Sequence, residues 1–403
     1  MAGALDGIRI LECSEMIAAP FAGMHLGDLG ADIIKVEPPT GEPWRLNTQF
    51  MPTESRTFLA LNRNKRDLAI DLKTAAGQEV IHALVPSMDV VIVNYRPDTP
   101  AKLGIDYDTL RAINPRIIYM ENTAMGRRGP QSHRPGYDLV AQAMTGLLIT
   151  GGRKDAGGLP LPLTPAIADY GTGLTMAFAI CAALFARERT GEGQKVEATL
   201  LATSLALQGG GFMRTGVDTG GSIEGSVAAT GGDARAAQAY YRAYATKDSM
   251  IVVACLTPVL RRKMADAMGI HDVRHERQIR RDSEEGLRVA HEVTAAITER
   301  MAERTTDEWL EVLDGAGVPA GPVRDITELP DDPQVLANDL VVTLEHPLVE
   351  SVSMVGPIVR MHGTPTAAQF APPTLGQHND EIMAELGYDA DRIASLRADG
   401  VIK

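Results

Sequence analysis

The chain has 403 residues, with 39 lysines and arginines against 52 aspartates and glutamates, which gives a formal net charge of −13. Hydrophobic residues make up 44% and charged residues 23%, and this mixture excludes a disordered chain, which lacks the apolar content to offset the entropy of ordering. The acidic balance argues against sequence-independent nucleic-acid binding, which needs a broad basic face.

Three cysteines, Cys13, Cys181 and Cys255, are too few and too widely spaced for a disulfide framework, which favours a reducing compartment. Residues 1–23 mix charged with apolar side chains, unlike a signal peptide. The longest apolar run, residues 174–186, is too short to span a bilayer. We therefore expect a cytoplasmic protein that binds neither a membrane nor nucleic acid.

The first 208 residues predict alternating strands and helices. Short apolar segments predict strands at residues 8–11, 31–36, 90–93, 117–119 and 195–198. Apolar residues at helical spacing predict helices at residues 20–29, 74–84, 107–113, 171–186 and 199–207. Strands that alternate with helices predict an α/β domain with a parallel sheet, covering residues 1–208.

The composition changes after residue 208. Residues 209–238 are rich in glycine and predict a linker. Residues 239–318 predict a smaller α+β domain, with a strand at 250–254 and helices at 258–268, 284–302 and 306–316. Residues 319–340 predict a second, extended linker. Residues 341–403 offer an edge-type strand and a closing helix at 379–386, and are expected to dock on the first domain because they are too short to fold alone.

Common nucleotide-binding and hydrolase motifs are missing from the sequence. It has no G-x-G-x-x-G after the first strand, no G-x-x-x-x-G-K-[ST] and no G-x-S-x-G. His271 and His275 stand four apart but lack the glutamate of a zinc-protease motif. We therefore expect no metal site.

A basic segment and a strand end are candidate ligand contacts. Residues 61–73 concentrate Lys and Arg in an acidic chain, which fits a solvated turn or a phosphate contact, and composition alone favours the turn. The residues Asn94, Tyr95 and Arg96 follow a predicted parallel strand, where ligands bind in open α/β sheets. Arg45 and Arg96 are further cations that could hold a carboxylate.

Asp169 precedes the long apolar helix predicted at residues 171–186. Spacing alone favours a helix cap, because aspartate is a preferred capping residue. The same position also suits a nucleophile, since the helix N-terminus favours the anion. Gly171 and Gly173 would let a bulky substrate approach the backbone closely.

The first 200 residues contain a series of short motifs, at residues 6–11, 18–20, 29–39, 62–73, 94–97, 169–173 and 191–196. Together these motifs resemble the class III CoA-transferase family, of the formyl-CoA transferase and carnitine-CoA transferase type, which is related to α-methylacyl-CoA racemase. Residues 240–248 and 315–323 match the family more loosely. The resemblance implies a Rossmann-like large domain built from both chain ends, a small domain, two long linkers and an interlocked homodimer.

The resemblance also implies a catalytic aspartate at Asp169. Its carboxylate would attack an acyl-CoA thioester to form a mixed anhydride and then an aspartyl-CoA thioester, before an acceptor acid takes the CoA. The expected partners are an acyl-CoA donor and a carboxylic acid acceptor. CoA thioesters enter as substrates, and no tightly bound cofactor is expected.

Family contacts to CoA fall on Ile70, Leu72, Lys73, Asn94, Tyr95 and Lys102. Two basic positions that some relatives use for CoA phosphates are Pro38 and Pro135 here, so phosphate binding must differ in detail. Tyr137 and Asp138 are expected in the substrate pocket.

Two other enzyme activities fit the same family. A racemase would carry a histidine where this chain has Tyr137, and a phenol is a poor base near neutral pH, which favours the transferase. A thioesterase, in which water captures the anhydride, would have the same sequence. Retention of Asp169 argues against a non-catalytic CoA-binding protein.

Overall fold

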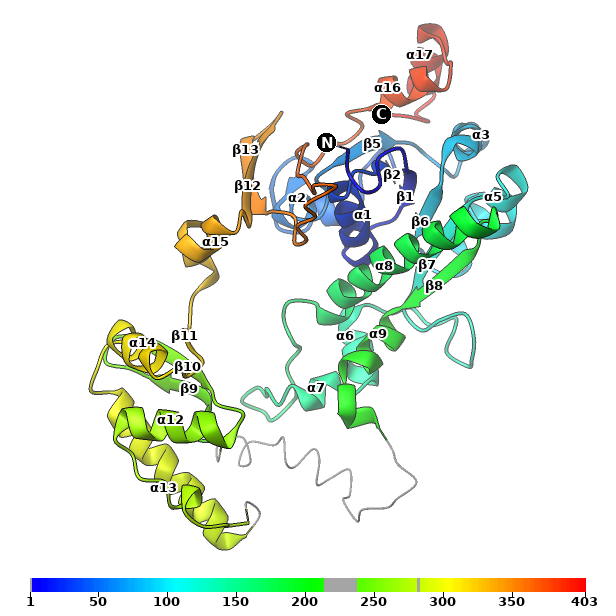
Figure 1. Cartoon of the computed structure of the whole chain (residues 1–403). Coiled ribbons are helices and arrows are strands. Elements are labelled where there is room, and N and C mark those ends of the chain that lie inside the picture. The colour runs from blue at the N-terminus through cyan, green and yellow to red at the C-terminus, as the bar shows by residue number, and fades with distance from the viewer. Residues whose placement is uncertain (1, 214–237, 281–282) are drawn as a thin grey trace. The chain divides into compact units, whose positions relative to one another are not determined.

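The computed structural model describes residues 2–213, 238–280 and 283–403. The chain divides into two compact units, which are described separately (Figure 1). Unit 1 comprises Met1–Met213 and Pro333–Lys403, and unit 2 comprises Arg214–Asp332. Of the predicted glycine-rich linker, residues 214–237 lie outside the described residues.

Unit 1 is built on a six-stranded sheet in which all neighbouring strands are parallel. In spatial order the strands are β5 (Lys65–Ala69), β2 (Asp32–Glu37), β1 (Arg9–Cys13), β6 (Val90–Val93), β7 (Ile118–Thr123) and β8 (Lys195–Thr199). The α/β class with a parallel sheet is confirmed. The strand order reverses between β1 and β6, and such switch points create a crevice at the carboxyl ends of the strands.

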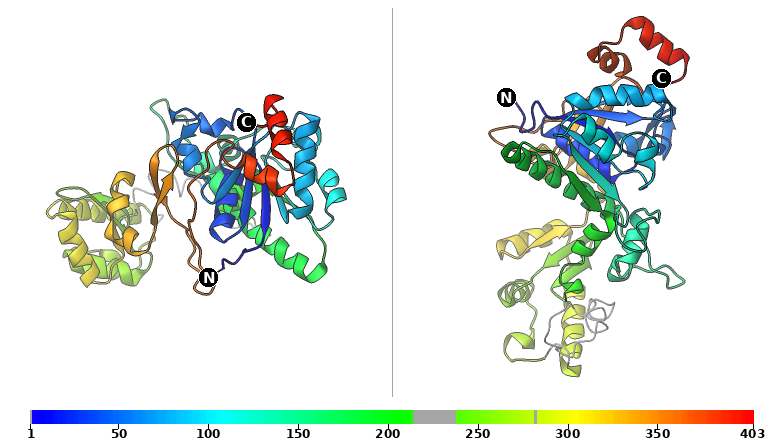
Figure 2. Two further views of the ribbon diagram at one scale, coloured as in Figure 1. Left: turned by 90° about the horizontal axis from the view of Figure 1, so that it is seen from above. Right: turned by 90° about the vertical axis from the view of Figure 1, so that its right-hand side faces the viewer.

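Helices cover both faces of this sheet, so successive strand residues enter two different cores (Figure 2). Ile10 packs in a core with α1 (Ala18–Asp28) and α8 (Ile167–Thr190), whereas Leu11 packs in a core with α3 (Ala75–Leu84) and the C-terminal helices α16 (Asn379–Glu385) and α17 (Ala390–Ala398). This alternation is the two-residue period of a strand. Burial on both faces explains why the strands are continuous apolar runs.

The chain forms further short elements in unit 1. These are η1 (Pro43–Arg45), β3 (Gln49–Met51), β4 (Glu54–Ser55), α2 (Arg56–Leu59), η2 (Val85–Ser87), α4 (Thr99–Lys102), α5 (Tyr107–Ile113), α6 (Asp138–Met144), α7 (Leu147–Thr150), α9 (Leu200–Leu207), η3 (Gly209–Phe212), α15 (Pro333–Ala337), β12 (Val341–His346) and β13 (Glu350–Val355).

The basic segment predicted as a solvated turn or a phosphate contact is mostly interior. Its first three cations are bound by carboxylates that lie far away in the sequence. The pairs are Arg63 with Asp28 at 2.5 Å, Lys65 with Glu12 at 2.8 Å and Arg66 with Asp32 at 2.6 Å. The solvated turn and the phosphate contact were therefore both wrong predictions for these three residues. Carboxylates that are distant in the sequence neutralise the three cations and allow strand β5 to form at the sheet edge.

Helix α8 is longer than predicted, at 24 residues. By length and composition it could cross a bilayer, which corrects the argument from residues 174–186 alone. In unit 1 its residues Met176, Ile180 and Leu184 are buried in the core that the sheet shares with α1. We therefore interpret α8 as a core helix of this unit.

Unit 2 is an α+β unit around a three-stranded antiparallel sheet in the order β11-β10-β9. Its elements are β9 (Tyr241–Ala245), β10 (Met250–Ala254), α12 (Pro258–Met268), η4 (Val273–His275), α13 (Glu284–Met301), α14 (Thr306–Gly315), β11 (Ala320–Pro322) and η5 (Ile326–Asp331). Residues 319–340 therefore differ from the extended linker predicted, since β11 pairs with β10 and two short helices follow it.

Candidate active site

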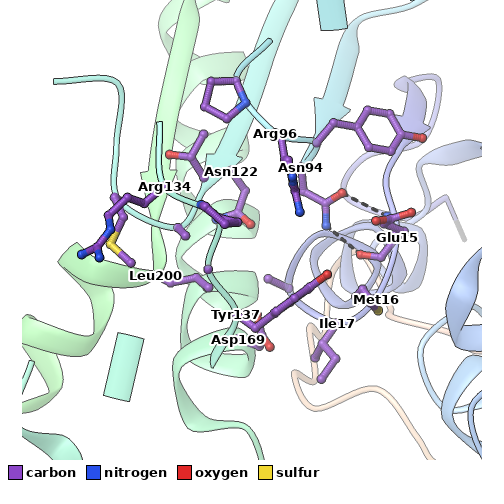
Figure 3. A pocket seen from close by; sticks show the side chains of 18 of the residues that line it. Glu15, Met16, Ile17, Asn94, Arg96, Asn122, Arg134, Tyr137, Asp169 and Leu200 are labelled. Atoms are coloured by element: carbon purple, nitrogen blue, oxygen red, sulfur yellow. Dashed lines mark hydrogen bonds between the residues drawn. The ribbon is translucent and has the colours of Figure 1, made fainter. Parts of the chain in front are cut away.

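A pocket opens at the carboxyl ends of β1, β6 and β7, where the strand order reverses (Figure 3). Its described lining comes from unit 1 alone. Residues 15–18 come from the loop after β1 and the first residue of α1, residues 94–97 come from the loop after β6, and residues 122–125 are the last two residues of β7 and the two that follow it. Asp169 and Tyr137 complete the wall at the starts of α8 and α6.

Asp169 is the third residue of α8 and does not cap it. The cap is supplied by Asp138, whose Oδ1 accepts hydrogen bonds from the backbone N–H groups of Ala168 at 2.7 Å and Asp169 at 3.3 Å. The capping role predicted from spacing therefore belongs to a carboxylate 31 residues earlier. This arrangement leaves the Asp169 side chain at the pocket.

Burial and, to a smaller extent, the neighbouring charge of Asp138 raise the pKa of Asp169 from 3.8 to about 7. The helix N-terminus was expected to keep this carboxyl ionised. Loss of hydration and the second carboxylate outweigh that effect. At neutral pH the group is therefore divided between its acid and carboxylate forms.

Gly173 serves helix packing and not substrate access. A Cβ atom at this position would lie 2.6 Å from the backbone oxygen of Ala18, so the glycine lets α1 and α8 cross closely. At Gly171 a Cβ would lie 3.1 Å from Cγ2 of Thr203 on α9. The prediction that both glycines admit substrate was wrong, because neighbouring helices occupy the space.

The close crossing brings the starts of several helices together beneath the pocket. Three alanines and a leucine form the contact, namely Ala18 of α1, Ala141 of α6, Ala168 of α8 and Leu200 of α9. Helix α1 has no side-chain cap and no acidic residue in its first turn. Met16, Ile17 and Ala18, which precede and begin this helix, line one side of the pocket, and the first N–H groups of a helix have no hydrogen-bond partner within it.

Asn94 lines the pocket, but its amide is used by the protein (Figure 3). The side-chain oxygen accepts from the Glu15 N–H at 3.0 Å, and the side-chain nitrogen donates to the Glu15 carbonyl at 2.6 Å. Both ends of the Glu15 peptide are thus fixed. Tyr95 also lines the pocket and packs against the core between the sheet and α3.

The other predicted CoA contacts lie outside the described pocket lining. The side chains of Ile70 and Leu72 are buried in the core with α3. Lys73 is exposed. Lys102 is exposed and pairs with Asp98 at 2.5 Å.

Of the two arginines proposed to hold a substrate carboxylate, only Arg96 lines the pocket. Arg45 is fully buried and binds Glu37 at 2.7 Å, so it is committed to the protein interior. Arg134 also lines the pocket and was not predicted. Tyr137 is 60% exposed at the pocket. Asp138 acts on the site indirectly, through its hydrogen bonds to the backbone at the start of α8.

Sequence reasoning missed the two segments at the carboxyl ends of β1 and β7. Residues 15–18 and 122–125 both lie at or just after the carboxyl end of an apolar strand, so the rule that identified Asn94 would have found them. Among the residues that the structure describes, no three His, Cys, Asp or Glu side chains are grouped so as to hold a metal ion.

Comparison with known proteins gives consistent results. A family model described as CoA-transferase family III matches residues 5–379. The succinyl-CoA:glutarate CoA-transferase of Mus musculus is 35% identical over 404 residues, covering 99% of this chain and 90% of that protein. The formyl-CoA:oxalate CoA-transferase of Streptomyces avermitilis is 31% identical over 416 residues, covering 100% of both. A solved CAIB/BAIF family protein from Brucella suis superposes with a TM-score of 0.78 at 30% identity, covering 96% of this chain and 100% of that chain.

Proposed function

The chain belongs to CoA-transferase family III, and we propose that it moves CoA between two carboxylic acids through covalent intermediates on Asp169. The observation that carries the proposal is the state of this carboxyl. It is largely buried at a pocket, its pKa is raised to about 7, and it forms no ion pair with any residue that the structure describes. A carboxylate that is poorly hydrated and unpaired is a stronger nucleophile than one in water.

The first half of the reaction loads the enzyme. An Asp169 carboxylate oxygen bonds to the thioester carbonyl carbon, the C–S bond breaks, and CoA leaves as its thiolate. The thiolate then attacks the Asp169 carbonyl of the mixed anhydride and releases the donor acid as its carboxylate. The enzyme now holds CoA as an aspartyl thioester.

The second half runs the same steps in reverse order with the acceptor. The acceptor carboxylate attacks the aspartyl thioester, forming a new mixed anhydride and releasing the CoA thiolate. Attack of the thiolate on the acceptor acyl carbon gives the product thioester and restores the Asp169 carboxylate. Each tetrahedral intermediate carries an oxyanion, and we assign its stabilisation to backbone N–H groups at the start of α1.

Small dicarboxylic acids are the substrate class that we propose. The relatives named above act on succinyl-CoA with glutarate and on formyl-CoA with oxalate. Arg96 and Arg134 in the pocket lining suit anionic substrates.

We retain Asn94 and Tyr95 as proposed CoA contacts within the pocket. The exposed Lys73 and Lys102 are proposed phosphate contacts outside it. Ile70 and Leu72 are proposed to act through backbone atoms only, because their side chains are buried.

We also propose that the protein works as a homodimer. Leu174, Phe178 and Phe185 form a stripe along α8 and are 44%, 65% and 66% exposed. Large apolar side chains gathered on one helix face are typical of subunit interfaces. Sedimentation of the wild type and of Phe178→Glu tests this, with a shift toward monomer expected only in the variant.

The experiment that tests the function measures thioester exchange from succinyl-CoA with and without acceptor acids. A transferase forms the acceptor's thioester and releases little free CoA when no acceptor is present. Rapid release of CoA without acceptor would favour a thioesterase. Deuterium incorporation at the substrate α-carbon without exchange of CoA would favour a racemase, although Tyr137 lines the pocket where that enzyme needs a base.

A further inference from the structure

The loop after β1 has an unusual backbone conformation at the pocket. Met16 has φ of 69°, a left-handed conformation that costs a residue with a side chain roughly 1 kcal/mol or more. Glu15, Met16 and Ile17 all line the same pocket as Asp169 (Figure 3). The conformation of this loop therefore shapes the wall that a substrate meets at the start of α1.

Contacts from behind the loop hold this conformation. The Met16 N–H donates to Oε2 of Glu42 at 2.7 Å, and the Ser14 carbonyl accepts from Nζ of Lys35 at 3.0 Å. Together with the two hydrogen bonds from Asn94 to Glu15, three consecutive residues are fixed by side chains from other parts of the chain.

Glu42 belongs to a set of buried ionisable residues that we call the charge cluster, all at most 2% exposed. Its members are Glu12, Lys35, Glu37, Glu42, Arg45, Glu54, Lys65 and Asp67. Glu42 links the other members of the charge cluster to the loop. Its Oε1 pairs with Lys35 at 2.9 Å, and its backbone N–H donates to Glu37 at 2.8 Å. Its Oε2 accepts the hydrogen bond from the Met16 N–H.

Stability alone does not account for this arrangement. Buried ion pairs often contribute less than the apolar side chains that could replace them, because both ions lose their hydration. Here two of the buried charged side chains form hydrogen bonds with backbone atoms of a loop that lines the pocket. These bonds hold the loop in a backbone conformation that it would not favour by itself. Fixed geometry at a reacting centre is worth large factors in rate.

We propose that Glu42 is a positioning residue, which holds the Met16 turn and so sets the start of α1 relative to Asp169. This inference rests on the proposed function for its effect on rate, but not for the contact itself. Glu42 acts through the loop and is not itself part of the pocket lining described for Asp169.

The substitution Glu42→Gln isolates this role. The amide keeps the size of the side chain but has one acceptor oxygen in place of two. The Lys35 ammonium, 2.9 Å from the present carboxylate, competes for that oxygen more strongly than a neutral N–H does. The Met16 N–H therefore loses its acceptor in the variant.

Glu54→Gln is the matched control. Glu54 is a fully buried member of the charge cluster, and its carboxylate lies against Arg45, Thr53 and His346 instead of the loop. Both variants remove one buried negative charge from the same cluster, so a general loss of stability should appear in both.

Two measurements on the full-length protein test the proposal. Hydrogen exchange read by mass spectrometry should show the Met16 amide exchanging about tenfold faster in Glu42→Gln, with little change in Glu54→Gln. Steady-state kinetics should show kcat about tenfold lower in Glu42→Gln with a similar KM for the acyl-CoA, and near-wild-type kcat in Glu54→Gln.

Unchanged Met16 exchange in Glu42→Gln would overturn the proposed contact. Faster exchange with wild-type kcat, or equal losses of kcat in both variants, would overturn the positioning role. If the wild type moves no CoA between any donor and acceptor, the proposed function fails. The hydrogen exchange of the Met16 amide still tests the contact between Met16 and Glu42 in that case.

Discussion

Unit 1 contains two kinds of buried carboxyl group, those paired with a cation and one without a cation. The first kind stabilises the fold, and the second is suited to catalysis. In the charge cluster, burial alone would raise the pKa of Glu37, but hydrogen bonding from Asp67 and the adjacent Arg45 guanidinium outweigh it and hold that pKa at about 2. At the pocket, burial and the neighbouring carboxylate of Asp138 together raise the pKa of Asp169 to about 7. A buried carboxylate with a cation is committed to that partner, whereas one without a cation remains reactive.

The pH dependence of folding has opposite signs at the two sites. Glu37 has a lowered pKa, so its contribution to stability is present above about pH 4.5 and is lost as the pH falls toward 2. Asp169 has a raised pKa, so it costs nothing below pH 3.8. Its cost grows as the pH rises toward 7 and is complete above that value.

The largest expected effect is on catalysis at Asp169. The substitution Asp169→Asn removes the nucleophile with little change in size, and CoA transfer should fall by about 10³-fold or more. The assay is thioester exchange between succinyl-CoA and an acceptor acid. A variant that retains wild-type turnover would show that this carboxyl takes no covalent part.

The same chemical change at Glu37 should instead disrupt folding. Glu37→Gln leaves Arg45 buried with its bidentate partner neutralised, and the free energy of unfolding should fall by about 3–5 kcal/mol. Urea denaturation at neutral pH measures this. A stable Glu37→Gln protein would contradict the structural role that we assign to the charge cluster.

Asp169→Asn should raise stability, in contrast with Glu37→Gln. The amide avoids the cost of burying an unpaired anion, so the gain should be at most about 4 kcal/mol at pH 8 and less than half of that at pH 5. Thermal unfolding of the wild type and the variant at both pH values tests the sign. A variant that is less stable at pH 8 would mean that the ionised group is well satisfied in the folded protein.

The smallest expected effect is the contribution of Asp138 to the pKa of Asp169. Asp138→Asn keeps an oxygen to cap α8 and removes one negative charge. The midpoint of the pH profile of kcat/KM should move below 7 by less than half of the total shift, because burial is the larger cause. A midpoint that does not move would show that Asp138 acts on the helix alone.

Much of the sheet could be predicted from local pattern. The strand at residues 90–93 and the helix at residues 107–113 were predicted with the bounds that the structure gives them. Strand β5 was missed because its residues include Lys65, Arg66 and Asp67, which suggest a solvated turn. The partners that neutralise its two cations, Glu12 and Asp32, are more than 30 residues away, and a local pattern carries no information about them.

The candidate site was predictable in its central residue and less so around it. Asp169 was identified through family resemblance, whereas spacing alone favoured a cap. The true cap, Asp138, is distant in sequence, so only the folded chain shows it. Arg45 was a reasonable cation candidate by composition, but its burial depends on Glu37 and on the packing of Phe58 against its guanidinium.

The most direct test of the central claim is mass spectrometry of the protein incubated with succinyl-CoA and then treated with hydroxylamine. An anhydride or thioester at Asp169 is converted to a hydroxamate, and the account predicts this modification on the peptide that contains Asp169. Glu15, the other acidic residue whose raised pKa and place in the pocket lining make it a possible nucleophile, is the internal control. A hydroxamate on Glu15, or none anywhere while CoA transfer proceeds, would contradict the account.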